Sequence, residues 1–550
     1  MSARKQAGMY RRITMGATLL FTLWVTALPL CAQSSGTILG VTKDASGAVI
    51  PGAGVTISNS DTGLARTLTT DASGAFRAPA LPVGHYDLKV EKSGFVTITE
   101  RGLTLEVAQE LVVNTTLQVG AASQEIRVSG EAPLVDTTTS SLGGVVDEQR
   151  MSDLPLNGRN YVDLTLLQPG VSVQTHTGQG GAGTWFSANG SPIRSNNYTL
   201  DGASMVNGLG AGTSSEVGST LGVDGIREYK VVTSAFSAEY GMAMGSQMVI
   251  VSKNGTNQFH GDVFEYLRNS ALDARNFFDT AQGSGGRRLP EFQRNNFGGA
   301  LGGPIKKDKT FFYGVYEGLH QNLGVTTIDS VLPAACHNLT PAGNSYRLTN
   351  PTSCAATLSA SSVVPAVMQP LLDLYPIPNL PNNQFTLPSA NRQDVHWAQM
   401  RIDHNFSAAD TMFGRYTIDD VGLDNATGFP SNRLIGSSRN QFLTLSESHI
   451  FSPTLLNTVR VSFSRMSFGQ GGVSGLDLTS PSYQLVTGQP MGQVAISGGI
   501  TGLPGLAQQA HQNQTVYTIN DDVYLMKGRN ALKFGTLINR YNLNNAFLIT

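Results

Sequence analysis

The sequence predicts a mainly β chain of several domains, and three observations lead to this fold class. Gly is frequent, at 61 of 550 residues, and only 14% of the residues are charged. This composition suits many short strands joined by turns better than it suits a helical enzyme. Turn signals recur at short intervals early in the chain, and strictly alternating apolar and polar segments recur in its second half. The length allows roughly three or four domains.

The first residues predict an export signal. Four basic residues open the chain, namely Arg4, Lys5, Arg11 and Arg12. An apolar run from Ile13 to Leu30 and small residues around Ala32 follow, which is the order of a secretory signal. We expect residues 1–32 to form the signal peptide. The alternative is a membrane anchor, because the run approaches the roughly 18 residues that can span a bilayer.

Residues 33–119 predict a β-sandwich of roughly seven strands. The element Asp-Ala-Ser-Gly-Ala occurs twice, from Asp44 and from Asp71, between segments that alternate in the manner of strands. Asp caps the backbone of a turn and Gly accepts a positive φ, so turn chemistry explains both copies. A calcium site is the sharper alternative for them.

Three stretches of this first unit resemble the carboxypeptidase regulatory-like domain. They are Gly36–Val55, Thr70–Phe76 and Leu81–Leu88. The resemblance implies a transthyretin-like sandwich that is appended to another protein and has no peptidase activity of its own.

A short strand-like segment follows the sandwich at a domain junction. It consists of Glu125, Ile126, Arg127, Val128, Ser129 and Gly130. It resembles a TonB box, the segment that an energy-coupling protein of the inner membrane captures in the periplasm. An exposed alternating segment is suited to such capture, because its backbone can add to the edge of a partner's sheet. The alternative is an ordinary first strand of the next domain.

Residues 120–253 resemble the plug domain of TonB-dependent receptors, most closely the Oar-like subfamily. Two short helical patterns lie between Val145 and Leu167, with Asn160 as a candidate cap. The motif Leu200, Asp201 and Gly202 follows, and the resemblance implies that it forms a turn in the plug sheet. The segment from Ile226 to Lys253 then resembles the last plug strands.

Residues 254–550 predict an antiparallel transmembrane β-barrel. Apolar residues alternate with polar ones in Thr458–Ser464 and Ala398–His404, as in strands with one face toward lipid and one toward a lumen. A second soluble sandwich or a propeller is the alternative. The other predicted strands are Phe259–Arg268, Phe292–Pro304, Lys309–Gly318, Asp410–Thr417, Gln441–Ile450, Val516–Met526 and Ala531–Tyr541.

The predicted barrel is partial. We count roughly nine or ten strands, whereas the plugged transporters of this type have about twenty-two. Unpaired strand edges are costly in lipid, so we expect the chain to be a truncated part of a longer protein. The long segments near 320–390 and 470–510 are expected to be loops. Cys336 and Cys354 lie in the first of them, and we favour a disulfide between them over two unpaired thiols.

The residues and the resemblance together predict a receptor of the cell outer membrane with its sandwich in the periplasm. We expect uptake of an unidentified extracellular substrate by energised movement of the plug, with outer-membrane lipid and a TonB-type energy-coupling protein as partners. No motif predicts catalytic residues, a cofactor, a metal or nucleic-acid binding. The alternative function is a surface-structural or adhesive protein that the barrel anchors.

Overall fold

A computed structural model describes most of the chain after the predicted export signal. Residues 1–32 and Gly130 lie outside the described part. The structure describes residues 35–120, 125–129, 141–156, 158–173, 185–207, 215, 221–237, 240–241, 243–274, 291–355, 362–426, 432–474, 477, 479–484, 486–489, 491–492, 494, 500–503, 509–528 and 530–548.

The first unit is a β-sandwich around its own apolar core. One sheet contains β1 (Gly36–Asp44), β4 (Ala75–Leu81), β7 (Glu110–Val112) and β8 (Thr115–Leu117). The other has the order β3 (Ala65–Thr69), β2 (Gly54–Asn59), β5 (Gly84–Glu91), β6 (Thr97–Leu105) and β9 (Glu125–Ser129). Alternate side chains of both sheets fill the space between them, among them Ile38, Val55 and Leu88, which are fully buried.

Turn chemistry explains both copies of the Asp-Ala-Ser-Gly element. Oδ1 of Asp44 accepts hydrogen bonds from the N–H groups of Ser46 and Ala48, at 2.8 and 2.9 Å. Oδ1 of Asp71 accepts the corresponding hydrogen bonds from the N–H groups of Ser73 and Ala75. Both carboxylates therefore serve the backbone of their own turns.

The second unit is the predicted α+β plug. Its sheet has the order β10 (Leu142–Asp147), β15 (Ile226–Ser234), β16 (Gln247–Ser252), β13 (Asn197–Leu200) and β14 (Ala203–Ser204). The short helix α2 (Glu148–Asp153) and the 3₁₀ helix η1 (Tyr161–Leu167) pack on it. Oδ1 of Asn160 accepts the N–H of Val162, so Asn160 caps η1 as predicted. Smaller elements complete the unit, namely β11 (Val171–Val173), β12 (Phe186–Ala188), η2 (Ile193–Ser195) and η3 (Val223–Gly225).

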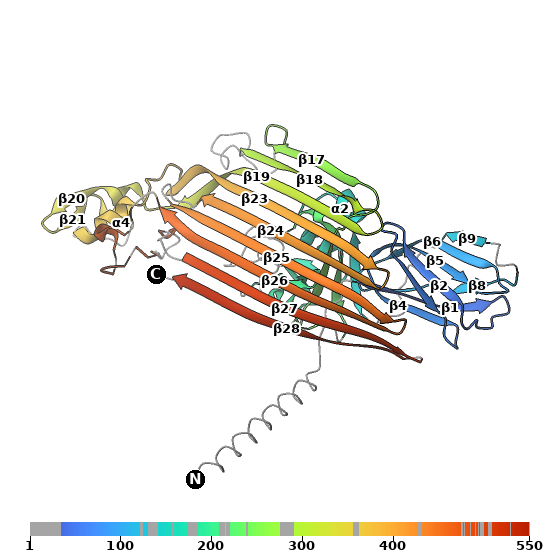
Figure 1. The fold of residues 1–550 in the computed structure, drawn as a ribbon. Coiled ribbons are helices and arrows are strands. Elements are labelled where there is room, and N and C mark those ends of the chain that lie inside the picture. The colour runs from blue at the N-terminus through green and yellow to red at the C-terminus, as the bar shows by residue number, and fades with distance from the viewer. Residues whose placement is uncertain are drawn as a thin grey trace, which may run out of the picture.

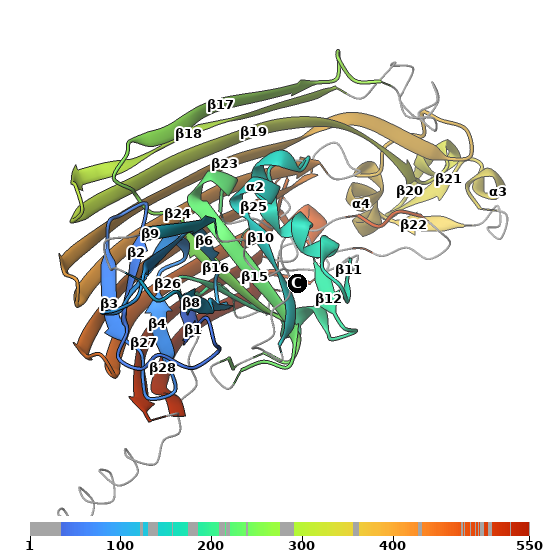
Figure 2. The same ribbon diagram turned by 90° about the vertical axis from the view of Figure 1, so that its right-hand side faces the viewer.

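The third unit is one antiparallel sheet of nine strands that curves around the plug (Figures 1 and 2). Each of the nine segments predicted from alternation corresponds to one of its strands, and most of the strands are longer than predicted. Phe259 and Lys309, the first residues of two predicted segments, lie just before β17 and β19. Its edge strands β17 and β28 are not paired with each other in the described part of the chain. In order, the strands are β17 (His260–Asn269), β18 (Phe292–Lys306), β19 (Thr310–Ser330), β23 (Gln384–Ser407), β24 (Asp410–Ala426), β25 (Asn432–Ser452), β26 (Leu455–Ser474), β27 (Gln509–Lys527) and β28 (Asn530–Leu548).

The two faces of this sheet separate polar from apolar side chains. On β26, Arg460 and Ser462 are buried on the concave face toward the plug, whereas Val461 between them is 48% exposed. On β23, Arg401 is buried and Ile402 is exposed. A soluble sandwich places its apolar face inside, so this inverted arrangement is that of a membrane barrel. Among the described residues no helix is long and apolar enough to cross a bilayer, a finding that does not bear on crossing by strands.

Short turns join the strands at the end of the sheet next to the sandwich, which we call the short-turn end. Long connections lie at the opposite, long-loop end (Figure 1). Two of them meet there, because Val331, Leu371 and Tyr375 of the β19–β23 connection pack with Met491 and Leu503 of the β26–β27 connection. We call this group the loop subdomain. Cys336 and Cys354 are joined by a disulfide within it. It also contains η4 (Ala334–His337), β20 (Leu339–Ala342), β21 (Ser345–Leu348), α3 (Pro351–Cys354), β22 (Val363–Pro365), η5 (Ala366–Met368), α4 (Gln369–Asp373) and η6 (Pro481–Tyr483).

Candidate functional site

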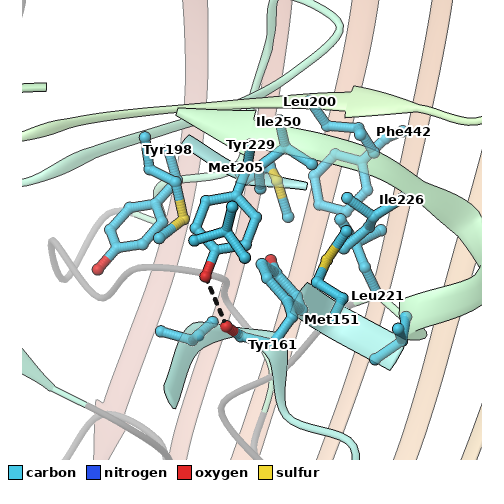
Figure 3. Close-up of a cluster of buried hydrophobic side chains, with 14 of the residues drawn as sticks. Met151, Tyr161, Tyr198, Leu200, Met205, Leu221, Ile226, Tyr229, Ile250 and Phe442 are labelled. Atoms are coloured by element: carbon cyan, nitrogen blue, oxygen red, sulfur yellow. Dashed lines mark hydrogen bonds between the residues drawn. The ribbon is translucent and has the colours of Figure 1, made fainter. Parts of the chain in front are cut away.

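The interface between plug and barrel wall begins with a shared apolar core. Figure 3 shows Phe442 of β25 among buried plug side chains that include Leu200, Ile226 and Ile250. The hydroxyl of Tyr229 donates to the carbonyl of Tyr161 at 2.9 Å and joins the sheet to helix η1. Burial raises the pKa of Tyr229, so this phenol remains a donor at neutral pH. The plug is therefore packed against the wall over part of its surface.

A charged latch lies beside this core, and the plug contributes Asp201 to it. Asp201 forms the turn between β13 and β14 with φ +46°, and its side chain is 1% exposed. Oδ1 accepts the N–H of Ser252 at 3.1 Å, and Oδ2 accepts its hydroxyl at 2.7 Å. These bonds tie the turn to the neighbouring strand β16.

The barrel wall contributes two arginines to the latch. Nε of Arg415 lies 2.7 Å from Oδ2 of Asp201, and Nη1 of Arg401 lies 3.7 Å from Oδ1. Arg415 is fully buried, and it also donates to Thr417, Thr444 and the carbonyl of Leu200. Burial by itself would raise the pKa of Asp201, but the two arginines and the bonds from Ser252 hold this pKa below its usual value. Asp201 is thus an anion at physiological pH, and its charge joins plug to wall.

A second ion pair joins the plug to another part of the wall. Arg159, which has φ +55°, places Nη2 2.7 Å from Asp224 of the plug and Nε 3.2 Å from Glu317 of β19. Its guanidinium also stacks on Phe264 of β17, 4.2 Å from the ring centre. The plug therefore meets the wall through charges on two sides.

Two cavities flank these contacts. One, of about 220 Å³, lies between the plug and the wall toward the long-loop end, and Arg159, Glu317, Trp397 and Asp419 line it. The other, of about 120 Å³, lies on the short-turn side of the latch. Its lining includes Asp201 and Arg401 of the latch and residues such as Asn59 of the sandwich, so sandwich, plug and barrel all border it.

The sandwich docks directly on plug strand β15. Glu228 accepts the N–H of Val107, and Nζ of Lys230 donates to the carbonyl of Ala108 at 3.1 Å. Val107 is also buried in a small apolar cluster with Val249 of β16. Burial raises the pKa of Glu228 to about 7, while the bond from Val107 opposes this shift. This contact joins the end of the sandwich sheet to the centre of the plug sheet.

The candidate TonB box forms strand β9 over Glu125–Ser129. It pairs in parallel with β6, from Thr97 opposite Glu125 to Arg101 opposite Ser129. It is therefore the last strand of the second sandwich sheet, and the plug sheet begins instead at β10.

The motif Leu200, Asp201 and Gly202, which the sequence predicted as a turn of the plug, contributes Asp201 to the contact with the wall. The sequence singled out this turn but did not identify its partners Arg401 and Arg415, and it did not single out Arg159. The alternation of β24 indicates that Arg415 shares a face with Thr417, which was the available signal for a lumen-facing position. It gives no information about which plug residue lies opposite.

Three potential metal ligands also lie close together in the described part of the chain. They are Asp410, Glu447 and His449, near the short-turn end of β24 and β25. All three are partly exposed, and acidic groups often cluster on surfaces without an ion, so we assign no metal to them.

The geometry described above defines a class of protein, namely one with a membrane sheet of the barrel type that curves around a plug and carries an appended sandwich at its short-turn end. The model of the outer membrane beta barrel domain matches residues 251–548. The carboxypeptidase regulatory-like domain matches residues 37–118, and the TonB-dependent receptor plug domain matches residues 135–246. The chain belongs to the outer membrane β-barrel family, and it combines this barrel domain with a TonB-dependent receptor plug domain and an N-terminal carboxypeptidase regulatory-like domain.

Among characterised relatives, the TonB-dependent transporter Oar of Myxococcus xanthus is 28% identical over 295 residues. The match covers 51% of this chain and 26% of that protein, so it spans about a quarter of the relative's length. Among solved structures, the outer membrane transporter YddB from Escherichia coli is 12% identical with a TM-score of 0.49, covering 74% of this chain and 50% of that one. The ferric-catecholate import receptor Fiu from E. coli is 14% identical with a TM-score of 0.41, covering 74% and 57%.

Membership of this family places the protein in the outer membrane and its N-terminal sandwich in the periplasm. The short-turn end is therefore periplasmic and the long-loop end extracellular. The plug domain that the chain matches is that of TonB-dependent receptors.

Proposed function

We propose that this protein takes up a substrate across the outer membrane by energised movement of the plug. The observation that carries the proposal is the charged latch, in which Asp201 of the plug meets Arg415 and Arg401 of the wall. A pull on the plug can break a few buried charged contacts in one step, because the strands of the wall stay paired when Asp201 leaves. The latch can then form again when the pull ends.

The proposed roles of the other residues follow from their places in the molecule. Glu125–Gly130 docks the TonB-type partner in the periplasm. The substrate enters from the loop subdomain, which the Cys336–Cys354 disulfide stabilises, and reaches the cavity beside Arg159. We propose limits of 1–32 for the signal and 254–550 for the barrel. The sandwich comprises the predicted 33–119 together with β9 (Glu125–Ser129), and the plug is the part of the predicted 120–253 that follows β9. Catalysis, a bound cofactor and a bound metal have no part in this function.

Deletion of Glu125–Gly130 tests the proposal without knowledge of the substrate. Leu221 of the plug is 3% exposed at the wall, so a cysteine there reports whether the plug moves. In energised cells we expect a thiol reagent to label Leu221→Cys, and we expect a protonophore or the deletion to suppress this labelling. Val473→Cys, at an exposed extracellular position of β26, should be labelled under all conditions.

Labelling of Leu221→Cys that is equal with and without Glu125–Gly130 would contradict energised plug movement through this segment. The barrel would then be better explained as an anchor for a surface-structural or adhesive protein.

A further inference from the structure

We infer that the sandwich presents the coupling segment, so that the edge of β9 without a neighbour among the described strands is a docking surface for one extended strand of the partner. The partner's strand then extends the sandwich sheet while β9 stays paired with β6. This inference rests on the proposed function, because it takes Glu125–Gly130 as the segment that the TonB-type partner captures. It adds a role for the sandwich, which becomes the element through which the partner acts on the plug.

The pairing of β9 supplies the first argument. All five of its residues pair with β6 in an unbroken parallel register, from Glu125 to Ser129. Within the described strands β9 has no second neighbour, so it ends the order β3-β2-β5-β6-β9. An edge strand presents a row of unpaired N–H and C=O groups, and such a row is a template for another strand.

The second argument is that pairing with β6 already fixes the backbone of β9 in an extended conformation. A free peptide loses backbone entropy when it becomes a strand, and this loss weakens binding. Pairing with β6 has ordered the segment before the partner arrives. Its sequence contains β-branched Ile126 and Val128, and neither Pro nor Gly occurs between Glu125 and Ser129. Pro is a common means of blocking an exposed edge, and it is absent from this one.

The position of β6 in the molecule supplies the third argument. The chain leaves β6 at Leu105 and within three residues reaches Val107 and Ala108, which bond to Glu228 and Lys230 of the plug. These two residues lie on β15, which pairs with β16. A pull on the extended sheet therefore has a path from β9 through β6 to β15 and β16, beside the direct path along the chain from β9 to β10, and β16 carries Ser252 of the latch.

A disulfide between β9 and β6 tests whether β9 binds the partner while it is paired with β6 or only after it has left β6. Thr99 and Arg127 are register partners, and paired strands lie about 4.8 Å apart, within the range of Cα separations that a disulfide spans. The probe is the purified periplasmic domain of the TonB protein from the same cell. It is titrated against the full-length receptor in detergent, and the dissociation constant is measured for Thr99→Cys/Arg127→Cys before and after reduction. The control is Thr56→Cys/Thr67→Cys, a register pair of β2 and β3 in the same sheet.

We expect the oxidised and reduced forms to bind within about threefold of each other, as the control pair does. A loss of about tenfold or more on oxidation, reversed by reduction and absent from the control, would overturn the inference, because it would mean that β9 must leave β6. Deletion of Glu125–Gly130 tests the proposed function separately. If the deleted receptor binds as well as the intact one, the docking segment is wrong and the inference falls with it.

Discussion

Replacement of Asp201 by Asn removes the charge of the latch and keeps nearly the same shape. Oδ1 of Asn can still accept the N–H of Ser252, and its amide NH2, in the place of Oδ2, can donate to the hydroxyl of Ser252. Asn also tolerates the left-handed backbone, so the φ of +46° adds little strain. The change therefore isolates the interaction between the plug carboxylate and the wall arginines.

The expected cost follows from what remains around Arg415. Arg401 keeps the carboxylate of Asp403, which accepts its Nη2 at 2.7 Å. Arg415 keeps only the hydroxyls of Thr417 and Thr444 and the carbonyl of Leu200 among its described contacts, and its side chain is fully buried. Removing one partner of a buried ion pair costs about 3–5 kcal/mol, because the other charge is left uncompensated. We expect Asp201→Asn to weaken the plug–wall association by about this amount.

Hydrogen exchange of the plug sheet measures this loss. The N–H of Asp201 donates to Ile250, and neighbouring amides of β13 and β16 report the same opening. A loss of about 3–5 kcal/mol should speed their exchange by roughly two to three and a half orders of magnitude, provided that they exchange through release of the plug. Amides of the β27–β28 pair should not change, because they belong to the wall.

Two control variants test whether loss of the Asp201 charge causes the faster exchange. Asp420→Asn removes the partner of Arg439 in an Asp–Arg pair whose side chains are 41% and 60% exposed, and it should change exchange by less than about tenfold. Asp201→Asn combined with Arg415→Met removes both charges and should recover most of the loss. Exchange in Asp201→Asn equal to that of the unaltered protein, or a double variant no better than the single one, would refute the latch.

Three further predictions concern other contacts. The pKa of Glu228 is raised from 4.5 in the unfolded chain to about 7, so its contribution to stability is full below pH 4.5 and is lost as pH rises through about 7. Glu228→Gln should remove this dependence and stabilise the docked sandwich by at most about 3 kcal/mol at pH 8, which limited proteolysis from pH 5 to 8 measures. Gly202→Ala should lower thermal stability by about 1–2 kcal/mol, because φ is +85° and the new Cβ lies 2.7 Å from Nη1 of Arg460; an unchanged melting temperature would contradict this. Cys336→Ser with Cys354→Ser should destabilise the loop subdomain by about 3 kcal/mol for a separation of 18 residues, seen as faster protease cleavage there while the barrel strands stay intact.

The strands could be predicted from the sequence because their faces lie in different surroundings. Arg460 and Val461 are neighbours, and their opposite surroundings in the barrel appear directly as alternation. The turns at Asp44 and Asp71 could be predicted for a similar reason, since the carboxylate and the N–H groups that it binds lie within four residues. Local chemistry of this kind can be read from a single sequence.

Only the plug residue of the latch, Asp201, could be predicted from the sequence. The position of Asp201 followed from its motif, but Arg415 lies more than two hundred residues further along the chain, and alternation assigns it a face without assigning it a partner. The docking of Val107 on Glu228 has the same character, because the groups that meet are a backbone N–H and a carboxylate in different domains. Contacts between separately folded units leave no periodic pattern in either sequence.

The two contacts that the sequence did not reveal are the ones that connect the units mechanically. The sandwich holds β15 through Glu228 and Lys230, and the wall holds the neighbouring turn through Asp201, with Ser252 at the end of β16 between them. A force that enters through the sandwich therefore meets β15 before it reaches the latch. For the sandwich to transmit this force, the Glu228 contact has to withstand at least the load that opens Asp201. If it fails first, the force reaches the plug only along the chain that joins β9 to β10. A variant that weakens the sandwich contact, such as Lys230→Met, should thus reduce energised labelling of Leu221→Cys without changing hydrogen exchange at β13. Faster exchange there would show that the two contacts are not separate.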